Sequence, residues 1–395
     1  MTIMSREGTE PPSLRFAEGR EHDSASRSAL SFGEPRVAAS GNTPTVRVVS
    51  LQAPGLLVVE ERPTSPLSPA HTRVTMKAAG VCSSDIPRSH GGAYGYPLVL
   101  GHELAGVVSE VGQGAEGPAK GTLVTVFPLL PCFSCTSCRG EEYARCSDYD
   151  YLGSRRDGGF ATFVDAPHWN LLPVPPGVSA RDAALTEPLA VVVHALDRLG
   201  LMPRSPTPKG LAILGCGFLG LLAMAVLRKT HPNLHVTVLG RHPGKLARAE
   251  ALGARVVLEA HHEELLATES FPRVLEAAGA PATFANSLAL ACPGGRVVWM
   301  GNPSGDVTLP QALASQVLRK ELTVCGTWNS RYRGREPSDW TIALDLMAGG
   351  VRPSAFVTAA VGLEGTPRLL KRLHALKEGG GPSELKALIT MDSSV

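Results

Sequence analysis

The sequence predicts an α/β protein in two parts, a β-rich region followed by a doubly wound parallel sheet. Between residue 45 and about residue 165, short alternating strands are separated by Gly and Pro turns, which is typical of a small barrel. From about residue 183, strands alternate with helices, and this order indicates a parallel sheet with helices on both faces. A chain of 395 residues is long enough for two buried cores.

The predicted β-rich region follows a polar N-terminal segment. Residues 1–44 are rich in Ser, Gly, Glu, Arg and Pro and show no apolar period, so we expect a disordered tail. Residues 45–62 read TVRVVSLQAPGLLVVEER, which predicts two alternating strands joined at a Pro-Gly turn. Further strand-rich stretches follow at residues 71–81, 103–112 and 122–130.

The second region begins with a predicted helix over residues 183–201. The pattern then predicts, in order, strand 211–215, helix 221–230, strand 235–240, helix 244–254 and strand 255–260, with later strands at 274–279, 296–301 and 321–328. Beyond about residue 328 we expect the chain to return to the first region. The predicted domains are therefore 45–190 with 329–395, and 191–328.

The composition disfavours several classes of protein. The formal net charge of +2 argues against a protein that coats nucleic acid or an anionic membrane. The N-terminus lacks the apolar core of a secretory signal, so we expect a cytoplasmic protein. Residues 210–227 are apolar over about the length of a membrane span, but their glycine spacing fits a buried strand and helix better. We expect no nucleic-acid partner and no membrane span.

A glycine-rich turn at residues 211–220, LAILGCGFLG, predicts dinucleotide binding. Its G-x-G-x-x-G pattern follows a predicted strand and opens a predicted helix, which is the context that the motif requires. The glycines would form a tight turn, admit a pyrophosphate and let the helix pack closely on the strand. The alternative is an ordinary turn of an α/β protein. The predicted cofactor contacts here and on a later strand are Gly215, Gly217, Phe218, Leu219, Gly220 and Gly301.

The end of the next strand predicts which nicotinamide cofactor is used. An acidic residue there would bind the ribose 2′-hydroxyl of NAD. The sequence instead has Gly240, followed by Arg241 and Lys245. Gly240 would leave room for a 2′-phosphate, and Arg241 would form a charge-assisted pair with it. We therefore expect a preference for NADP over NAD; a solvated basic turn is the alternative.

Four of the eight cysteines lie in one short stretch, PCFSCTSCRGEEYARC. A disulfide framework is expected mainly in small secreted chains, and this chain is neither small nor visibly secreted. A zinc ribbon would separate two C-x-x-C pairs more widely. Four thiolates suit a closed tetrahedral zinc site that leaves no position for a substrate. The cluster is therefore interpreted as a structural zinc site with the ligands Cys132, Cys135, Cys138 and Cys146.

Other residues are candidates for an open metal site, which needs three protein ligands and a free position. They are Cys82 in GVCSSD, His102 in LGHELAG and Glu187 in LTEPLAV. Each alone has an ordinary structural interpretation, as a small core residue, a hydrogen-bonded core histidine and a solvated helix end. Their occurrence together in a chain with a dinucleotide motif favours a catalytic zinc site.

Several motifs, in order, resemble the zinc-containing medium-chain alcohol dehydrogenases. These are GHELAGVVSEVG, the cysteine loop at residues 132–146 and ILGCGFLG, and the resemblance covers about residues 45–395. Further segments, GAYGYPLVLGHE, PLLPCFSC, GSRRDGGF, TEPLAV and LRKELTVCGTW, are similar to the polyol branch, to galactitol-1-phosphate dehydrogenases in particular. The chain departs from that branch at Gly240, where an acid is missing, and in its long N-terminal tail.

The resemblance implies a fold, a metal content and a mechanism. The fold is a GroES-like catalytic domain and a Rossmann domain with a cleft between them, and each chain binds two zinc ions. Glu187 replaces a third cysteine ligand, directly or through water. Zinc lowers the pKa of the substrate hydroxyl, and Ser84 relays the proton. Asp85 orients His102, while Glu103 adjusts coordination or ligand exchange. Hydride then passes from the carbinol carbon to the nicotinamide.

The implied enzyme is an NAD(P)-dependent dehydrogenase of a secondary alcohol on a polyol or polyol phosphate. Arg155 and Arg156, just after the cysteine loop, are predicted to bind an anionic group of the substrate. The alternative is a surface ion pair with Asp157. We also expect a homo-oligomer, either a dimer or a tetramer.

Two other functions remain open at the level of sequence. A cyclitol or aminocyclitol dehydrogenase would use the same chemistry on a ring, and no residue separates it from an acyclic polyol dehydrogenase. A non-catalytic nucleotide-binding or sensor protein would keep the fold without an open metal site. The joint presence of four candidate residues argues against this second alternative: Cys82, Ser84, His102 and Glu187.

Overall fold

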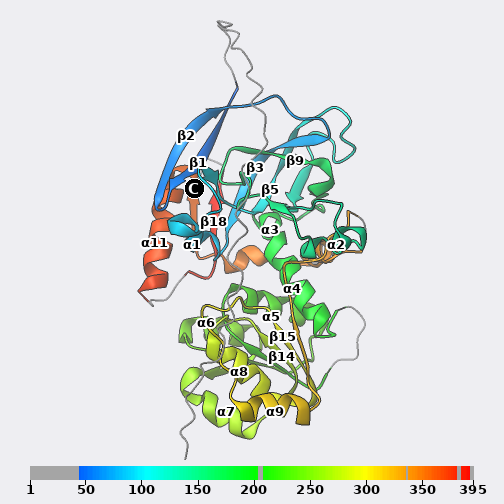
Figure 1. Ribbon diagram of the computed structural model, residues 1–395, viewed down its shortest axis with the longest axis vertical. Coiled ribbons are helices and arrows are strands. Elements are labelled where there is room, and N and C mark those ends of the chain that lie inside the picture. Colours follow the sequence, from blue (N-terminus) through cyan, green and yellow to red (C-terminus); the bar gives the residue numbers. More distant parts are fainter. Residues whose placement is uncertain (1–43, 203–207, 335–336, 380–383, 392–395) are drawn as a thin grey trace, which may run out of the picture. The chain divides into compact units, whose positions relative to one another are not determined.

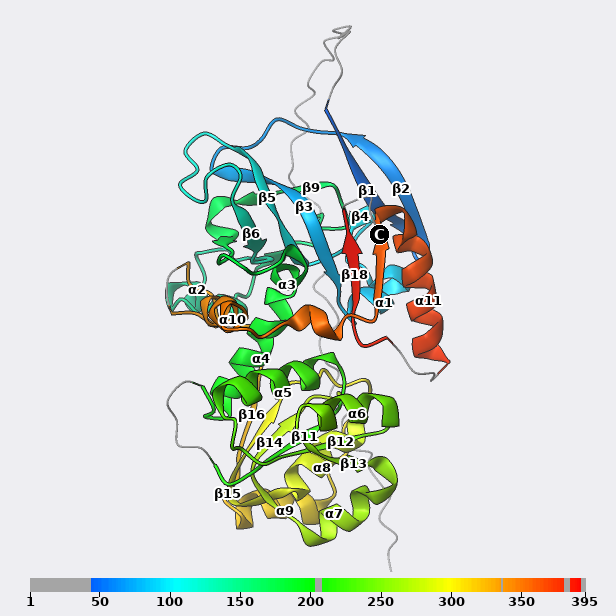
Figure 2. The same cartoon turned by 180° about the vertical axis from the view of Figure 1, so that it is seen from behind.

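The computed structural model describes residues 44–202, 208–334, 337–379 and 384–391. The tail predicted at residues 1–44 lies outside the described residues, apart from Pro44. Figures 1 and 2 show the chain from two opposite sides. A mixed β-rich sheet and a wholly parallel sheet are both present, so the predicted fold class is confirmed.

The β-rich region is built on a seven-stranded sheet of order β10-β6-β5-β3-β18-β17, with β9 paired to β3. A three-stranded sheet, β2-β1-β4, and the pair β7-β8 complete it. The strands are β1 (Thr45–Ala53), β2 (Leu56–Pro63), β3 (His71–Val81), β4 (Leu98–Val99), β5 (Glu103–Val111), β6 (Leu123–Val126), β7 (Leu129–Leu130), β8 (Asp150–Tyr151), β9 (Phe163–Pro167), β10 (Leu171–Pro173), β17 (Ala359–Gly362) and β18 (Ala387–Thr390). The C-terminal strand β18 pairs antiparallel with β3, which places residues of the chain end beside the end of that strand.

The second sheet has six parallel strands in the order β13-β12-β11-β14-β15-β16. They are β11 (Leu211–Leu214), β12 (Val236–Gly240), β13 (Arg255–Leu258), β14 (Phe271–Glu276), β15 (Ala291–Trp299) and β16 (Thr323–Gly326). Successive residues of β11 belong to different hydrophobic cores. Ile213 packs with residues of α4–α6, and Leu214 packs with residues of α7–α9. Helices therefore cover both faces, because successive side chains of a strand point to opposite sides.

The helices of the described chain are short to medium in length. They are α1 (Asp85–Pro87), α2 (Thr136–Arg139), α3 (Ala180–Ala184), α4 (Thr186–Arg198), α5 (Phe218–Thr230), α6 (Pro243–Ala251), α7 (His262–Thr268), α8 (Pro281–Ala289), α9 (Gln311–Arg319), α10 (Asp339–Ala348) and α11 (Thr366–Glu378).

Prolines interrupt two elements that the sequence pattern predicts as continuous. The helix predicted over residues 183–201 is divided at Leu185 into α3 and α4. Pro188 lies in the first turn of α4, where its missing N–H is tolerated, so a new helix starts there. The stretch 122–130 is likewise divided, because Pro128 separates β6 from β7.

The apolar stretch at residues 210–227 is divided between β11 and α5, as predicted. Leu211 and Leu221 are both fully buried in the core beside the parallel sheet. Among the described residues, no helix combines the length and the apolar character needed to cross a bilayer.

Candidate active site

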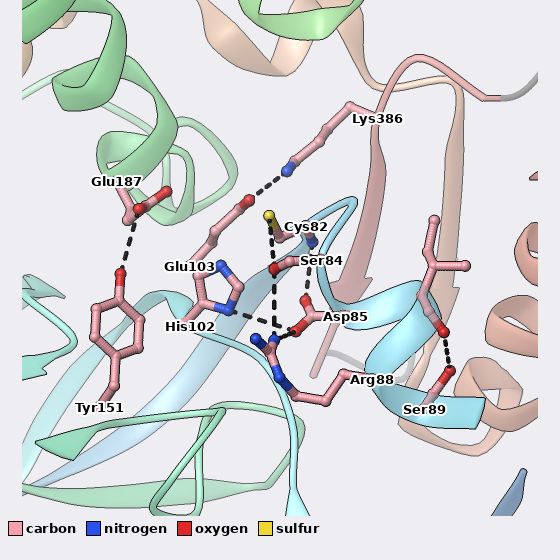
Figure 3. Close-up of polar contacts among 11 residues, drawn as sticks. Cys82, Ser84, Asp85, Arg88, Ser89, His102, Glu103, Tyr151, Glu187 and Lys386 are labelled. Atoms are coloured by element: carbon pink, nitrogen blue, oxygen red, sulfur yellow. Dashed lines mark hydrogen bonds and ion pairs between the residues drawn. The ribbon is translucent and has the colours of Figure 1, made fainter. Parts of the chain in front are cut away.

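Three potential metal ligands meet at the ends of two paired strands in the β-rich sheet. Cys82 directly follows β3, while His102 and Glu103 stand at the start of β5, which runs antiparallel to β3. One ligand atom from each of these residues lies within 4.8 Å of the other two (Figure 3). The antiparallel pairing therefore brings together residues that are twenty positions apart in the sequence.

Two glycines make the cluster sterically possible. Gly80 is paired with Glu103, and a Cβ at Gly80 would lie 1.8 Å from Glu103 Oε2. Gly101 has a φ of 94°, and a Cβ there would lie 2.4 Å from Phe160 Cδ1. Both positions therefore require glycine, the first for the Glu103 carboxylate and the second for a left-handed turn against an aromatic ring.

Asp85 holds the cysteine and the histidine in place. Its Oδ2 accepts a hydrogen bond from the Cys82 backbone N–H at 2.9 Å, and its Oδ1 lies 3.4 Å from His102 Nδ1. Burial lowers the pKa of His102, but Asp85 and the Cys82 thiolate outweigh burial and raise it well above its usual value. An Nδ1 turned toward a carboxylate leaves Nε2 for a metal. This geometry is what the orienting role predicted for Asp85 requires.

Ser84 lies next to the candidate metal ligands. Its hydroxyl donates to Cys82 Sγ at 3.3 Å and accepts a hydrogen bond from Arg88 Nη1 at 3.4 Å. Arg88 also lies 3.5 Å from Asp85 Oδ1, which is completely buried. The serine is therefore within reach of a group bound at the cluster, as a proton relay would have to be.

Glu187 lies beside the cluster and not within it. The carboxylate is buried at the start of α4, and its Oε1 accepts a hydrogen bond from the Tyr151 hydroxyl at 3.4 Å. Burial raises the pKa of Glu187 to about 7. Among the described residues, the compact ligand group contains Glu103 in place of the Glu187 expected from the sequence. The contact with Tyr151 holds the Glu187 carboxylate, which nevertheless lines the same cavity.

Sequence reasoning missed Lys386 and Tyr151. Lys386 Nζ donates to Glu103 Oε1 at 2.5 Å, and both side chains are buried. The same Nζ lies 4.8 Å from the centre of the Phe218 ring in the glycine-rich turn at residues 211–220, hereafter called the nucleotide turn. A single lysine directly before an apolar strand was the only signal for the first residue, and nothing in the local sequence marked the second.

The donor set of this cluster fits zinc. Glu103 Oε2 is buried, and within the described part of the chain it has no hydrogen-bond partner. A buried carboxylate oxygen without a donor is costly, so a cation beside it would satisfy it. Thiolate, imidazole and carboxylate are all zinc ligands, and three of them leave a fourth tetrahedral position free.

The four cysteines between residues 132 and 146 also converge. Their sulfur atoms lie within 4.8 Å of one another, and three of the separations are 3.5, 3.9 and 3.9 Å. A disulfide would need about 2.05 Å, whereas a zinc tetrahedron with Zn–S bonds of about 2.3 Å has sulfur–sulfur edges of about 3.8 Å. The backbone N–H of Ser147, followed by that of Cys138, lowers the pKa of Cys135 to about 5. The geometry fits a closed four-thiolate site.

The glycine-rich turn lies between β11 and α5, as the motif requires. A Cβ at Gly215 would lie 2.7 Å from Ala278 N, and one at Gly220 would lie 2.1 Å from Gly215 O. Gly217 has open space where a Cβ would be. Gly301 is equally confined, because a Cβ there would lie 2.4 Å from Gly279 N. The turn can therefore admit a phosphate close to its backbone at Gly217.

Gly240 is more tightly surrounded than the sequence suggests. A Cβ there would lie 3.1 Å from Leu246 Cδ2 and 3.2 Å from Cys216 Cβ. These side chains fill part of the space that we expected to be open, because they pack against the end of β12. Arg241, the next residue, is exposed, and Lys245 lines the cavity described below.

One cavity of about 570 Å³ connects the metal cluster with the nucleotide turn. Residues of both regions line it, among them Cys82, Glu187, Gly217 and Ala277. Of the two arginines predicted to bind substrate, Arg155 lines this cavity. Arg156 does not line it; its side chain is 65% exposed and forms an ion pair with Asp150 at 2.7 Å. Both arginines line a second cavity, but only Arg155 also lines the one that contains the metal cluster. The alternative of a surface ion pair therefore applies to Arg156, with Asp150 as its partner.

Comparisons with known proteins identify the family of this chain. Residues 68–176 match the family described as alcohol dehydrogenase GroES-like domain, and residues 219–349 match zinc-binding dehydrogenase. Galactitol 1-phosphate 5-dehydrogenase of Escherichia coli K12 is 33% identical over 283 residues, which cover 70% of this chain and 80% of the relative. The chain belongs to the zinc-containing medium-chain alcohol dehydrogenases.

Solved structures of this dehydrogenase family show the same fold. The crystal structure of galactitol-1-phosphate dehydrogenase from Escherichia coli has a TM-score of 0.78 and 29% identity, covering 87% of this chain and 99% of that one. A zinc-binding dehydrogenase from Sinorhizobium meliloti, bound to NADP, has a TM-score of 0.77 and 26% identity, covering 88% and 99%. The GroES-like and Rossmann-type architecture of this dehydrogenase is thereby confirmed, and it is an oxidoreductase.

Proposed function

We propose that this dehydrogenase oxidises a secondary alcohol of a polyol or polyol phosphate to a ketone, with NADP as the hydride acceptor. The observation that carries the proposal is the single cavity that joins Cys82 and His102 to the nucleotide turn at Gly217. The relationship to galactitol 1-phosphate 5-dehydrogenase supports a polyol substrate. Arg241 at the end of β12 supports the phosphorylated cofactor.

We propose that Cys82, His102 and Glu103 would hold a catalytic zinc, with Glu187 close enough to line its open side. Bound zinc supplies Lewis acidity, which lowers the pKa of a substrate hydroxyl. Asp85 fixes the histidine ring, and Lys386 fixes the Glu103 carboxylate. The second zinc would be held by the four cysteines of residues 132–146 and would have a structural role.

Ser84 is proposed to act as a proton relay that accepts the proton of the reacting hydroxyl. Its Oγ lies 3.3 Å from Cys82 Sγ and accepts from Arg88 Nη1. A serine hydroxyl both donates and accepts, so it can take up the proton of the reacting hydroxyl while it passes its own proton to solvent in the cavity that it lines. The adjacent guanidinium favours any negative charge that develops on the serine oxygen.

The test is turnover by the purified protein. NADPH oxidation is followed with a panel of ketoses, ketose phosphates and cyclic ketones, and zinc is counted by elemental analysis. We expect turnover of at least one acyclic substrate and two zinc ions per chain. Cys82→Ala should lose activity and one zinc ion while keeping its circular dichroism spectrum. Cys292→Ala, in β15 of the other sheet, should keep its activity and both zinc ions. Metal-loaded protein that reduces none of the panel with either cofactor would refute the proposal.

A further inference from the structure

We propose that the cavity contains a subsite for an oxyanion, formed chiefly by Arg155 with Arg88 as a second cation, which selects a polyol that carries a phosphate or a carboxylate. The inference rests on the proposed function and specifies its substrate class. Both arginines line the cavity that contains Cys82 and Ser84. An oxyanion would therefore be bound in the same cavity as the reacting hydroxyl.

Arg155 is held in position without having its charge neutralised. Its Nη1 donates to the Tyr149 backbone carbonyl at 2.6 Å. The guanidinium carbon lies 4.2 Å from the centre of the Tyr149 ring and 4.9 Å from that of the Tyr94 ring. Among the residues that the structure describes, no carboxylate forms an ion pair with it. Stacking fixes a planar guanidinium while leaving N–H donors at its edge for a ligand.

A tight turn places Arg155 close to the metal cluster. Its backbone N–H donates to the Tyr151 carbonyl at 2.9 Å. The Tyr151 ring lies edge-on to the His102 ring at 5.7 Å, and its hydroxyl contacts Glu187. One loop therefore touches the metal cluster through Tyr151 and presents a cation to the cavity four residues later.

Arg88 supplies positive charge on the side of Ser84. Its side chain is 17% exposed, and its carboxylate partner, Asp85, also receives the Cys82 N–H and faces His102. Its Nε is buried and has no partner among the described residues. Figure 3 shows the guanidinium beside Ser84 and Asp85. Because the Asp85 carboxylate is shared in this way, it does not fully compensate the positive charge of Arg88.

The acidic residues that line the cavity all have other partners. Glu103 pairs with Lys386, and Glu187 accepts from Tyr151. Glu384, the third acid in the lining, pairs with Arg372 at 2.9 Å. No acid in the lining is therefore placed to neutralise the charge of Arg155. An anionic substituent of the substrate would supply the missing partner.

Arg155→Gln tests the proposal, and Arg156→Gln is its control because the neighbouring arginine lies outside the cavity. Galactitol 1-phosphate, galactonate and galactitol serve as phosphorylated, carboxylated and neutral substrates. Arg155→Gln should raise KM for the phosphorylated or the carboxylated substrate by about tenfold or more and leave KM for galactitol unchanged. The control variant, Arg156→Gln, should leave KM unchanged for all three substrates. The substrate with the larger increase identifies the oxyanion.

A binding measurement separates failure of the subsite from failure of the proposed function. Inorganic phosphate is titrated by calorimetry into zinc-loaded protein saturated with NADP, so that the cofactor's own phosphate sites are filled. Binding that is lost in Arg155→Gln and kept in Arg156→Gln supports the subsite even if no polyol is turned over. The subsite would be overturned if Arg155→Gln raised KM equally for the charged and the neutral substrates, or raised KM for none of them. Phosphate binding that does not depend on Arg155 would also overturn it.

Discussion

At the scale of single residues, the candidate site depends on polar groups that are buried together. Glu103 and Lys386 are 1% and 5% exposed, and the two side chains are each other's charge partner. Two buried charges are stable only as a pair, because each loses its hydration. The pair also joins three elements, since Lys386 contacts Phe218 in the nucleotide turn as well.

Lys386→Met should destabilise the protein by about 3 kcal/mol, because it leaves the Glu103 carboxylate buried without its cation. The urea midpoint of zinc-free protein measures the effect, because zinc bound to Glu103 would itself compensate the carboxylate. The loss should exceed that of Lys377→Met on the exposed end of α11. Adding Glu103→Gln should restore most of the stability, since the uncompensated charge is then removed. Equal midpoints for the two lysine variants would contradict this account.

At the scale of elements, the loop at residues 132–146 is organised by its cysteines and by aromatic packing. The Phe133 and Tyr143 rings lie 5.2 and 5.4 Å from the Trp169 ring. The helix α2 within the loop has only four residues, which is too short to be stable by itself. The thiolate cluster would therefore fix the loop internally, while the contacts with Trp169 attach the loop to the rest of the β-rich region.

Cys135→Ser should release one zinc per chain and lower the thermal midpoint, because a structural site that loses one thiolate binds zinc far more weakly. Turnover at low temperature should be largely retained, since Cys135 lies outside the cavity of the active site. Elemental analysis and calorimetry measure the two effects, with Cys292→Ser as the control. Unchanged zinc content in Cys135→Ser would show that the four thiolates do not form a zinc site.

At the scale of the whole molecule, one cavity is lined by both the β-rich and the parallel-sheet regions. A cofactor bound there would contact both regions and would bind only the folded chain. Such a ligand stabilises the folded state by about 2.7 kcal/mol at a hundred times its Kd. Cofactor choice should therefore be visible in thermal unfolding without any turnover.

NADP should raise the thermal midpoint more than NAD does at the same concentration. Arg241→Gln should weaken NADP binding by about tenfold or more and leave the effect of NAD unchanged. Gly240→Asp is a less specific variant, because its side chain would also displace Leu246 or Cys216. Arg248→Gln, in the last turn of α6, is the control. A larger shift with NAD would show that the β12–α6 turn selects the other cofactor.

Much of the candidate site was predictable because its residues belong to short sequence motifs. Four cysteines at close spacing, a G-x-G-x-x-G turn and a G-H-E triplet each require particular residue types at fixed positions, and local sequence carries that requirement. Lys386 carries no such pattern, since its partner Glu103 is distant in sequence and only the pairing of both β18 and β5 with β3 brings them together.

The sequence by itself therefore determined the fold class and the family, and it marked the four cysteines that the structure brings together, because strand and helix periods and tight residue spacings are local properties. Tertiary structure alone decided which carboxylate approaches Cys82 and His102. Glu103 does so because Gly80 leaves it space, while Glu187 is held by Tyr151. It also distinguished Arg155 from Arg156, because only the first of these adjacent side chains reaches the cavity with the metal cluster, while the second is paired with Asp150.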